Sequence, residues 1–424
     1  MRRIAWTDER MRGVEMLSKE DTELLTRVGP GTPCGDLLRR YWQPVAFVTE
    51  LTAERPKKRM KVMGEELVIF RDAAAGYGLV GEHCSHRGTS LYYGFLEDGG
   101  LRCPYHGWLY DKHGHCLEQP FEPAQSMMKH AINHPAYPVQ ELAGMLFAYM
   151  GPPGTAPILP RWDILVREDG QRDFELHEIL NCNWVQAEEN TGDVTHTYFL
   201  HSYAFKMQGR PEVGAFFGRP MAQYGFQPFQ WGMLKSWMYD EEKTKTGWGN
   251  LLIFPNMLRL SRLMHWRVPV DDTHTRIFWL NFPALTPGQI RCPDPVINSE
   301  LPWTDERGEF TMDSFASQDA MAWETQGPVF DRSQEHLGAS DRGVVLFREM
   351  LKEQILLLQR GGEPMARATD PSLNDIVDMR PWLTESDYDL GAAPAEAIFD
   401  ERHEIVDVPF GKARPPRAAL GVSH

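Results

Sequence analysis

CSHRG at residues 84–88 and CPYHGW at residues 103–108 are the two stretches that decide the fold of this chain. Each offers one thiolate and one imidazole: Cys84 with His86, and Cys103 with His106. Two cysteines on one iron and two histidines on the other can hold a two-iron, two-sulfur cluster, and the neutral imidazoles raise its reduction potential. The pattern therefore favours a redox centre carried by two loops.

A structural zinc site is the alternative, because two cysteines and two histidines also suit tetrahedral zinc. Zinc fingers usually pair cysteine with cysteine and histidine with histidine, whereas each stretch here supplies one of each. Gly88 and Gly107 stand next to the ligands, where the backbone has to approach sulfur closely. These features favour the iron-sulfur cluster.

Composition limits the remaining possibilities. The chain has 424 residues and a hydrophobic fraction of 42%, which suits two globular domains. Its 44 Lys and Arg against 59 Asp and Glu give a net charge of −15, which disfavours nucleic acid as a partner. No apolar run approaches the roughly 18 to 20 residues of a membrane helix, and the N-terminus MRRIAWTDERMRG has no apolar signal segment. With six cysteines, two of them cluster ligands, we expect a cytoplasmic protein that has no disulfide framework and no membrane contact.

Local sequence patterns divide the chain into three parts. Ser18 is a helix N-cap signal that opens a short helical lead-in. Alternating segments such as KVMGEELVIFRD and GMLFAYMGPP then indicate a small β domain that carries the two loops. The stretch GPPGTAPILP at residues 151–160 excludes helix and central strand. We predict a lead-in over residues 1–43 that packs on the last domain, a cluster domain over 44–157, and a catalytic domain over 158–424.

A second constellation lies in CNWVQAEENTGDVTHTYFLH, residues 182–201. Asp193 and His196 are three residues apart and share a helix face, but His196 and His201 differ by five, about 140° around a regular helix. The two histidines could still bind one metal if the helix is bulged or ends between them. Two histidines with a carboxylate form the facial triad of a non-haem iron that activates dioxygen. The alternative is a pair of ordinary histidines on a polar helix.

The stretches CSHRG, CPYHGW and NTGDVTHTYFLH, in this order and separation, resemble the catalytic subunit of a Rieske non-haem iron oxygenase. The resemblance covers nearly the whole chain. It implies that the four loop residues bind the cluster, and that His196 and His201 bind the catalytic iron. It further implies that Asp193 bridges His196 to the cluster ligand His106 of a neighbouring subunit. Asn190 matches an Asn that lines this iron site without binding the metal.

The third iron ligand has to be a distant carboxylate. Spacing alone leaves Asp305, Asp313, Asp319, Glu324, Asp331 and Asp341 open. The segment FASQDAMAWETQG is similar to the family's C-terminal motif, in which the ligand follows a polar residue and precedes an aromatic residue or Met by four. That similarity selects Asp319, which follows Gln318 and precedes Trp323.

The C-terminal segment and the lead-in LLTRVGPGTPCGDLLRRYW resemble the phthalate dioxygenase group, which works without a small β subunit. The implied fold is α+β: a Rieske β domain, then a helix-grip (START-like) domain whose antiparallel sheet wraps over a long helix. The implied assembly is a homotrimer, or a stacked homohexamer, in which each cluster faces a neighbour's iron. The implied cofactors are a Rieske 2Fe-2S cluster and a mononuclear Fe(II), with O2 as co-substrate. No GxGxxG nucleotide-binding fingerprint is evident, so electrons from NAD(P)H should come through a separate reductase.

Substrate class rests on weaker signals. Arg259 lies in the strand-like run NMLRLSRLMHWRVP and could clamp a carboxylate if it points inward, or be an ordinary surface arginine if it points outward. We therefore predict an aromatic substrate, preferably a carboxylate, that undergoes ring dihydroxylation or O-demethylation; N-demethylases also occur in this group. The alternative is a Rieske-type electron-transfer protein without oxygenase activity, which would leave the C-terminal half of the chain unexplained.

Overall fold

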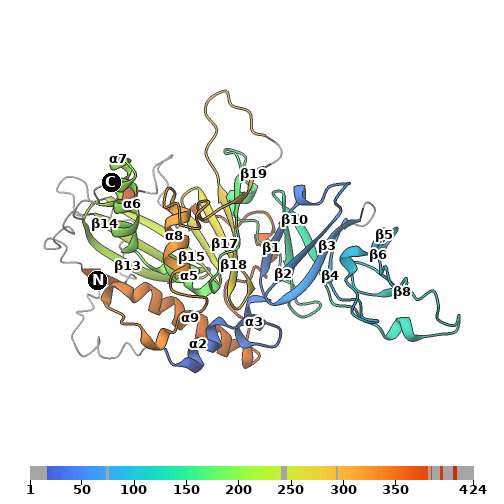
Figure 1. The fold of residues 1–424 in the computed structure, drawn as a ribbon. Coiled ribbons are helices and arrows are strands. Elements are labelled where there is room, and N and C mark those ends of the chain that lie inside the picture. Colours follow the sequence, from blue (N-terminus) through green and yellow to red (C-terminus); the bar gives the residue numbers. More distant parts are fainter. Residues whose placement is uncertain are drawn as a thin grey trace.

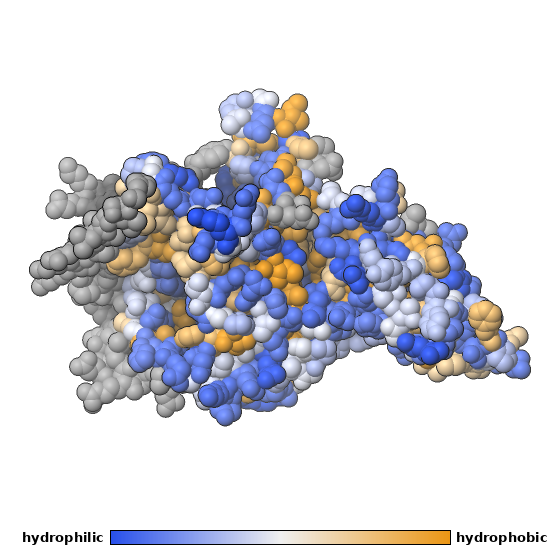
Figure 2. Space-filling view, in the orientation of Figure 1, coloured by the Kyte–Doolittle hydropathy of each residue, from blue (hydrophilic) through white to orange (hydrophobic). Residues whose placement is uncertain are grey.

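A computed structural model describes residues 17–72, 76–239, 246–292, 295–380, 383, 392–394 and 404–407 of the chain. The N-terminal part consists of small sheets, and the C-terminal part is one large sheet covered by helices (Figure 1). The predicted α+β class is therefore confirmed. No helix within the described ranges is long and apolar enough to cross a membrane. Most of the face seen in Figure 2 is hydrophilic, in keeping with the high content of charged residues.

Two short helices open the described chain. Ser18 accepts a hydrogen bond from the backbone N–H of Asp21 and caps helix α2 (Lys19–Thr26), as predicted. Helix α3 (Pro33–Leu38) begins with a proline at its first position, where no backbone N–H is needed. Both helices pack against helix α9 (Arg342–Gln359) of the C-terminal part.

The N-terminal part is built from antiparallel strands in three sheets, two of four strands and one of three. The three-stranded sheet has the order β1 (Trp42–Phe47), β11 (Met145–Tyr149), β10 (Val139–Leu142). The second sheet has the order β2 (Lys57–Val62), β3 (Glu65–Asp72), β4 (Gly76–Gly81), β9 (Ala136–Tyr137). The third has the order β5 (Phe95–Glu97), β6 (Gly100–Arg102), β7 (Leu109–Tyr110), β8 (Cys116–Glu118). The first Cys-His loop follows β4, and the second connects β6 to β7.

The C-terminal part is organised by a ten-stranded sheet. Its strands follow the order β19 (Val296–Leu301), β12 (Asp173–His177), β18 (His274–Asn281), β17 (Leu263–Asp271), β16 (Met257–Leu260), β15 (Thr246–Ile253), β14 (Gly232–Tyr239), β13 (Met221–Phe229), β21 (Glu404–Asp407), and β20 (Ala392–Pro394) pairs with β15. All pairings are antiparallel except the one between β12 and β19, which is parallel. The antiparallel sheet that the resemblance implied is thus present with one parallel edge strand.

Helix α5 (Trp184–Gly192) lies between this sheet and α9, because it contacts β15, β16 and β17 on one side and α9 on the other. A buried ion cluster ties it in place: Glu189 accepts two hydrogen bonds from Arg332, at 2.8 and 3.0 Å, and one from Arg348 at 2.6 Å. Paired buried charges of this kind fix the orientation of a helix, because removing one partner leaves the others uncompensated. The other helices are α4 (Asp163–Val166), α6 (Ser202–Met207), α7 (Pro211–Phe217) and α8 (Phe315–Glu324), and short helical turns span Val48–Glu50, Leu91–Tyr93, Met128–Ala131, Arg332–Gln334, Ala339–Asp341 and Pro371–Asn374.

The hydrophobic core is continuous across the two parts. One cluster of buried side chains includes residues of α3, β1, β11, the large sheet and α9. Within it the rings of Phe147 and Trp266 lie 6.2 Å apart, centroid to centroid. A separate small core surrounds the two Cys-His loops. The division of the chain at residues 43 and 157 stays a prediction, because packing runs across both positions.

Candidate metal centres

The two Cys-His loops have the same backbone turn. The N–H of Gly88 donates to the carbonyl of Cys84 at 2.8 Å, and the N–H of Gly107 donates to the carbonyl of Cys103 at 3.1 Å. Both glycines have positive φ angles, 74° and 76°, which a side chain would disfavour. The first loop has the spacing CxHxG and the second has CxxHG, and in both the glycine follows the cysteine by four residues. The two loops therefore form equivalent turns, and each turn presents one thiol and one imidazole.

The side chains of the loops converge. The imidazoles of His86 and His106 lie 4.6 Å apart, and His86 stacks on the indole of Trp108 at the same separation. The Nδ1 of His86 is buried and has no hydrogen-bond partner within the described residues. A buried ring nitrogen without a partner fits a metal ligand, because an unmet lone pair is otherwise costly.

Both thiols are buried, at 3% exposure each. Burial raises the pKa of Cys103, and the adjacent thiol of Cys84 raises it further. The hydroxyl of Tyr110 lies 3.3 Å from the Cys84 sulfur. Two buried thiols and two partly exposed imidazoles on these loops match the donor set of a cluster with two thiolates on one iron and two imidazoles on the other.

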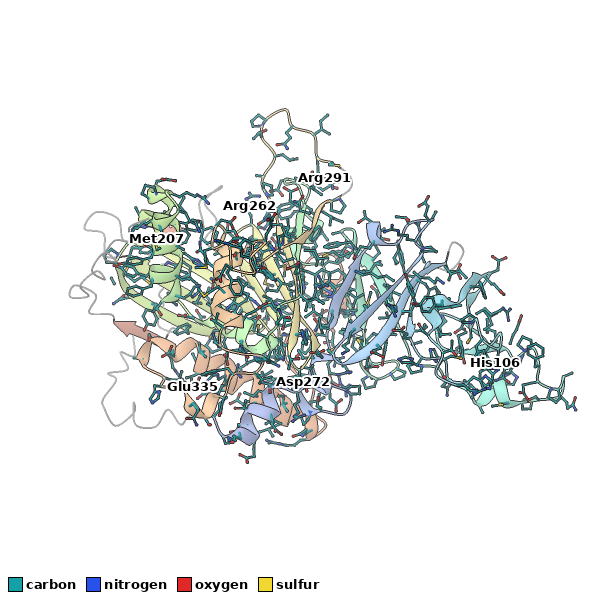
Figure 3. The ribbon with its side chains drawn as sticks, viewed as in Figure 1. His106, Met207, Arg262, Asp272, Arg291 and Glu335 are labelled. Carbon is teal, nitrogen blue, oxygen red and sulfur yellow. The ribbon has the colours of Figure 1, made fainter. Side chains whose placement is uncertain are left out.

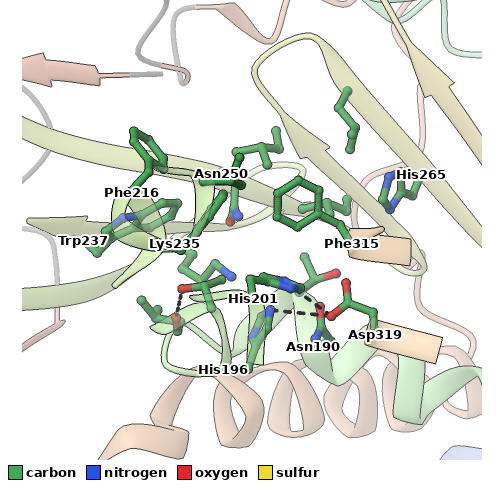
Figure 4. A pocket seen from close by; sticks show the side chains of 18 of the residues that line it. Asn190, His196, His201, Phe216, Lys235, Trp237, Asn250, His265, Phe315 and Asp319 are labelled. Carbon is green, nitrogen blue, oxygen red and sulfur yellow. Dashed lines mark hydrogen bonds and ion pairs between the residues drawn. The ribbon is translucent and has the colours of Figure 1, made fainter. Parts of the chain in front are cut away.

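The second constellation forms where helix α5 ends. The helix stops at Gly192, and a π-helical turn spans Thr197–His201. The wider turn changes the angle between His196 and His201, so that both point toward Asp319 on α8. The Nε2 atoms of His196 and His201 lie 4.0 and 3.6 Å from Oδ1 of Asp319 (Figure 4). One ligand atom from each of the three residues falls within 4.8 Å of the others.

The protonation of His201 is set by its neighbour. Gln318 donates its side-chain N–H to the carbonyl of Met312 at 2.9 Å, which turns its oxygen toward His201 Nδ1 at 2.8 Å. His201 therefore carries its proton on Nδ1 and presents the Nε2 lone pair to Asp319, the arrangement that a metal ligand needs. Burial lowers the pKa of His201, which keeps the ring neutral.

His196 is oriented from the other side. Its Nδ1 lies 3.3 Å from Oδ2 of Asp193, whose second oxygen accepts hydrogen bonds from the backbone and hydroxyl of Thr195 at 2.7 and 3.0 Å. Burial would raise the pKa of Asp193, but the contacts with His196 and Thr195 outweigh it and hold this pKa below its usual range. Asp193 is thus a carboxylate that fixes the His196 ring and remains a quarter exposed.

The other acidic candidates for the third ligand have different partners. Asp305 pairs with Arg307, Asp313 accepts from Thr311, Glu324 accepts from Asn181, Asp331 caps a short helical turn, and Asp341 accepts from the backbone of Gly338. Asp319 alone among them belongs to the group of residues that could hold a metal ion in the described part of the chain. Its Oδ1 is buried and has no hydrogen-bond partner there, which also fits a metal ligand.

A cavity of about 500 Å³ opens beside these three residues. Asn190, predicted to line the iron site, is one of its walls. The other walls come mainly from apolar and aromatic side chains of the segment after α5, of α7, of the large sheet and of α8: Val194, Val213, Phe216, Phe217, Trp237, Tyr239, Leu258, Leu260, Leu263, Trp279 and Phe315. A cavity of this size and lining suits a flat aromatic molecule.

Arg259 does not reach this cavity, which contradicts its prediction as a substrate residue. Its neighbours Leu258 and Leu260 line the cavity, and strand alternation sends Arg259 to the opposite face. There it is fully buried and pairs with Asp163 at 3.0 Å. The sequence alone could not tell which face of the strand points inward.

Sequence reasoning also missed polar residues of the cavity. Lys235 and Asn250 come from β14 and β15, and His265 comes from β17. The sequence gives only a weak indication of Lys235. Strand alternation places it on the same face as Met233, Trp237 and Tyr239, so that one cation shares the inward face with apolar side chains.

Two family models match the chain. The model for the Rieske [2Fe-2S] domain matches residues 41–138, which include both Cys-His loops. The model described as LigXa C-terminal domain like matches residues 304–379, which include Asp319. The first match favours the iron-sulfur cluster over the zinc alternative.

Three curated relatives match most of the chain. The 5,5'-dehydrodivanillate O-demethylase oxygenase subunit of Sphingobium sp. (strain NBRC 103272 / SYK-6) is 35% identical over 86% of this chain and 86% of its own length. The phenoxybenzoate dioxygenase subunit alpha of Ectopseudomonas oleovorans is 38% identical over 80% of this chain and 86% of its own. The phthalate 4,5-dioxygenase oxygenase subunit of Pseudomonas putida is 33% identical over 82% of this chain and 88% of its own.

The fold is also similar to solved structures. The NdmA QL mutant of Pseudomonas putida CBB5, solved with theobromine, superposes with a TM-score of 0.59 over 80% of this chain and 97% of that chain. Its identity is 19%, so the likeness concerns the fold.

Proposed function

The chain belongs to the Rieske non-haem iron oxygenases, as an alpha subunit of the phthalate dioxygenase-like group, and on that premise we propose that it hydroxylates an aromatic carboxylate. It is the terminal oxygenase component of a multicomponent enzyme. O-demethylation of a methoxylated aromatic acid is the first candidate, because the relative that matches 86% of the chain at 35% identity is named an O-demethylase. Ring dihydroxylation is the second, since the relative at 38% identity is named a dioxygenase.

The observation that carries this proposal is the convergence of His196, His201 and Asp319 at one end of an apolar cavity. We assign these three residues as ligands of a mononuclear iron. We assign Cys84, His86, Cys103 and His106 as ligands of the 2Fe-2S cluster. The iron would supply dioxygen activation, using electrons that arrive one at a time through the cluster.

The chain's own residues prepare the iron site for this chemistry. Gln318 holds the His201 proton on Nδ1, and Asp193 holds the ring of His196. His196, His201 and Asp319 would hold an iron by two imidazoles and one carboxylate, a donor set suited to dioxygen activation, and the cavity beside them would hold the substrate. The aromatic walls, among them Phe216 and Phe315, exclude water and take up the flat face of a ring. Asn190 lines this site without a role as a ligand.

Electron delivery between subunits is part of the proposal. His106 lies at the far end of the N-terminal part (Figure 3), while the cavity lies in the C-terminal part beside α8 and the large sheet (Figure 1), so that the two sites of one chain lie far apart. A ring of subunits that places His106 against Asp193 of a neighbour would bring the sites together. We therefore propose a homotrimer, or a stacked homohexamer, that receives electrons from a separate NAD(P)H-dependent reductase.

An electron carrier without oxygenase activity is disfavoured. Relatives that are named oxygenase subunits match 80% or more of this chain, including the part that holds His196, His201 and Asp319. A carrier would have no use for this second group of ligands.

Iron content and a substrate screen test the proposal. The purified protein should hold about three irons per chain, two in the cluster and one in the second site. With a surrogate reductase, methoxylated benzoates should consume O2 and release formaldehyde, whereas ring dihydroxylation would yield a diol without formaldehyde. Two irons in the intact protein, with no oxidation of any aromatic acid, would contradict the proposed function.

A further inference from the structure

Lys235 is a buried cation on the wall of the substrate cavity. Its side chain lies on β14 at 3% exposure, and its ammonium donates to the backbone carbonyl of Asp193 at 2.6 Å. It makes no ion pair with a carboxylate within the described residues. It is also the only Lys or Arg among the described residues that line the cavity. A buried ammonium has three donors, and this one hydrogen bond leaves two of them for a ligand.

Two neighbours on the same wall also have unmet hydrogen-bonding capacity. Asn250 faces Lys235 directly across strands β14 and β15, is 6% exposed, and has a side-chain oxygen without a partner in the described part of the chain. Trp237 follows Lys235 by two residues on the same face of β14, and its indole N–H likewise has no partner among the described side chains. In Figure 4 these three side chains lie together, apart from His265.

An anion is the ligand that would satisfy this wall. The carboxylates of Asp193, Asp319 and Glu188 partly offset the burial of this charge, but burial outweighs them. A ligand carboxylate would offset more of that cost while it accepts hydrogen bonds from the ammonium and the indole. The Asn250 amide can rotate to present its NH2 group. Burial lowers the pKa of Lys235 to about 8, so that it remains largely protonated at pH 7.

The other titratable groups of the cavity are unsuited to bind an anion. His265 is buried, and burial holds its pKa well below its usual value, so the ring is neutral. Glu212 is acidic and exposed. His196, His201 and Asp319 are assigned to the iron. Lys235 is therefore the one side chain of the described cavity lining that is suited to bind a substrate anion.

We propose that Lys235, with Asn250 and Trp237, binds the carboxylate of an aromatic substrate and gives the enzyme its preference for acids over neutral aromatics. The inference rests on the proposed function and extends it by locating the specificity residue. It replaces Arg259, whose side chain lies on the opposite face of the sheet and pairs with Asp163.

Equilibrium binding tests this proposal without reliance on turnover. The probes are the three methoxybenzoate isomers, each paired with its uncharged methoxybenzamide, titrated calorimetrically into the iron-loaded protein at pH 7. The substitution Lys235→Met removes the charge at similar length, and Lys206→Met removes one from the exposed surface of α6 as a matched control. Cluster absorption and the melting temperature report whether each variant is folded.

We expect the wild type to bind at least one benzoate about tenfold or more tightly than its amide, as charge-assisted hydrogen bonds predict. In Lys235→Met this preference should disappear while amide affinity changes less than about threefold, and Lys206→Met should keep it. If Lys235→Met loses affinity equally for the acid and the amide, Lys235 has a merely structural role and the inference is overturned. The inference is also overturned if the variant keeps the full preference for the acid.

Turnover separates failure of this inference from failure of the proposed function. If the wild type oxidises methoxybenzamides as well as methoxybenzoates, the inference is wrong and the oxygenase function stands. A wild type that binds and oxidises neither series would overturn both. Methoxyphenols are a third set of probes. If the binding of methoxyphenols depends on Lys235 and the binding of methoxybenzoates does not, Lys235 recognises a phenolic oxygen, which would contradict the proposal.

Discussion

His201 Nδ1 lies 2.8 Å from the side-chain oxygen of Gln318, the residue that directly precedes Asp319. One segment of α8 thus supplies both a candidate iron ligand and the group that orients a second ligand. This hydrogen bond explains how Gln318, 117 residues after His201, can determine which ring nitrogen of His201 carries the proton. Residues that hydrogen-bond to a metal ligand typically change metal affinity by about tenfold to 100-fold when they are mutated.

Replacing Gln318 by leucine should weaken iron binding by about tenfold to 100-fold, because His201 then loses the acceptor that fixes its proton on Nδ1. Iron retained after dialysis against a graded chelator series would measure the change. Gln326→Leu, at the exposed end of the same segment, serves as the control and should retain iron like the wild type. Equal retention by the two variants would show that Gln318 does not support the site.

Replacing His196 by alanine should abolish turnover and lower the iron content from about three to about two per chain, since the cluster lies elsewhere in the fold. The red-brown absorption of the cluster should persist. His336→Ala, which removes an exposed histidine, should keep all the iron. Bleaching of the cluster in the His196 variant would contradict its assignment to the mononuclear site.

Asp193→Asn should keep both metal centres, because asparagine can still accept a hydrogen bond from His196, but it loses the charge that would face a partner's His106. We expect the cluster to reduce the iron about tenfold or more slowly in single-turnover, stopped-flow measurements. Asp313→Asn alters an exposed aspartate before α8 and provides the comparison. An unchanged rate for Asp193→Asn would remove its role as the bridge.

The stability of the protein should depend on Lys235 through pH. Burial lowers the folded pKa of Lys235 from 10.5 to about 8, so the folded state binds the proton less tightly than the unfolded state. The cost of burying the charge is fully present below pH 8 and is relieved as pH rises from about 8 toward 10.5. Relative to Lys235→Met, the wild type should gain about 1 to 2 kcal/mol between pH 8 and 9.5. Melting temperatures across this range would show it, and a pH-independent difference would argue against a buried ammonium.

The sequence predicted those parts of the site that are local. The two Cys-His loops are short turns whose glycines have positive φ angles. Each motif contains both the ligands and the glycine that the turn needs. His196 and His201 could be paired only on the assumption of a bulged or ended helix, and the π-helical turn supplies that bulge. Asp319 was selected by resemblance, since no local rule relates it to residues more than one hundred positions earlier.

The cavity wall could not be predicted, because it depends on which face of each strand points inward. Arg259 and Lys235 are both cations in strand-like runs, yet Lys235 faces the cavity and Arg259 pairs with Asp163 behind the sheet. Alternation gives the relative faces of neighbours on one strand, but the packing of helix α5 against the sheet decides which face encloses the site. Which face points inward is therefore decided by tertiary packing and cannot be deduced from the sequence of one strand.

If His106, at the far end of the N-terminal part, faces the iron site of a neighbouring subunit as proposed, two individually inactive variants should repair each other. Cys84→Ser chains would keep an intact iron site, and His196→Ala chains would keep an intact cluster. In a mixed assembly, some subunit boundaries would bring the intact cluster of one chain against the intact iron site of the other. Co-expressed variants should therefore regain a fraction of the activity that neither has alone, which would make this enzyme a case of complementation between defective copies of a single gene.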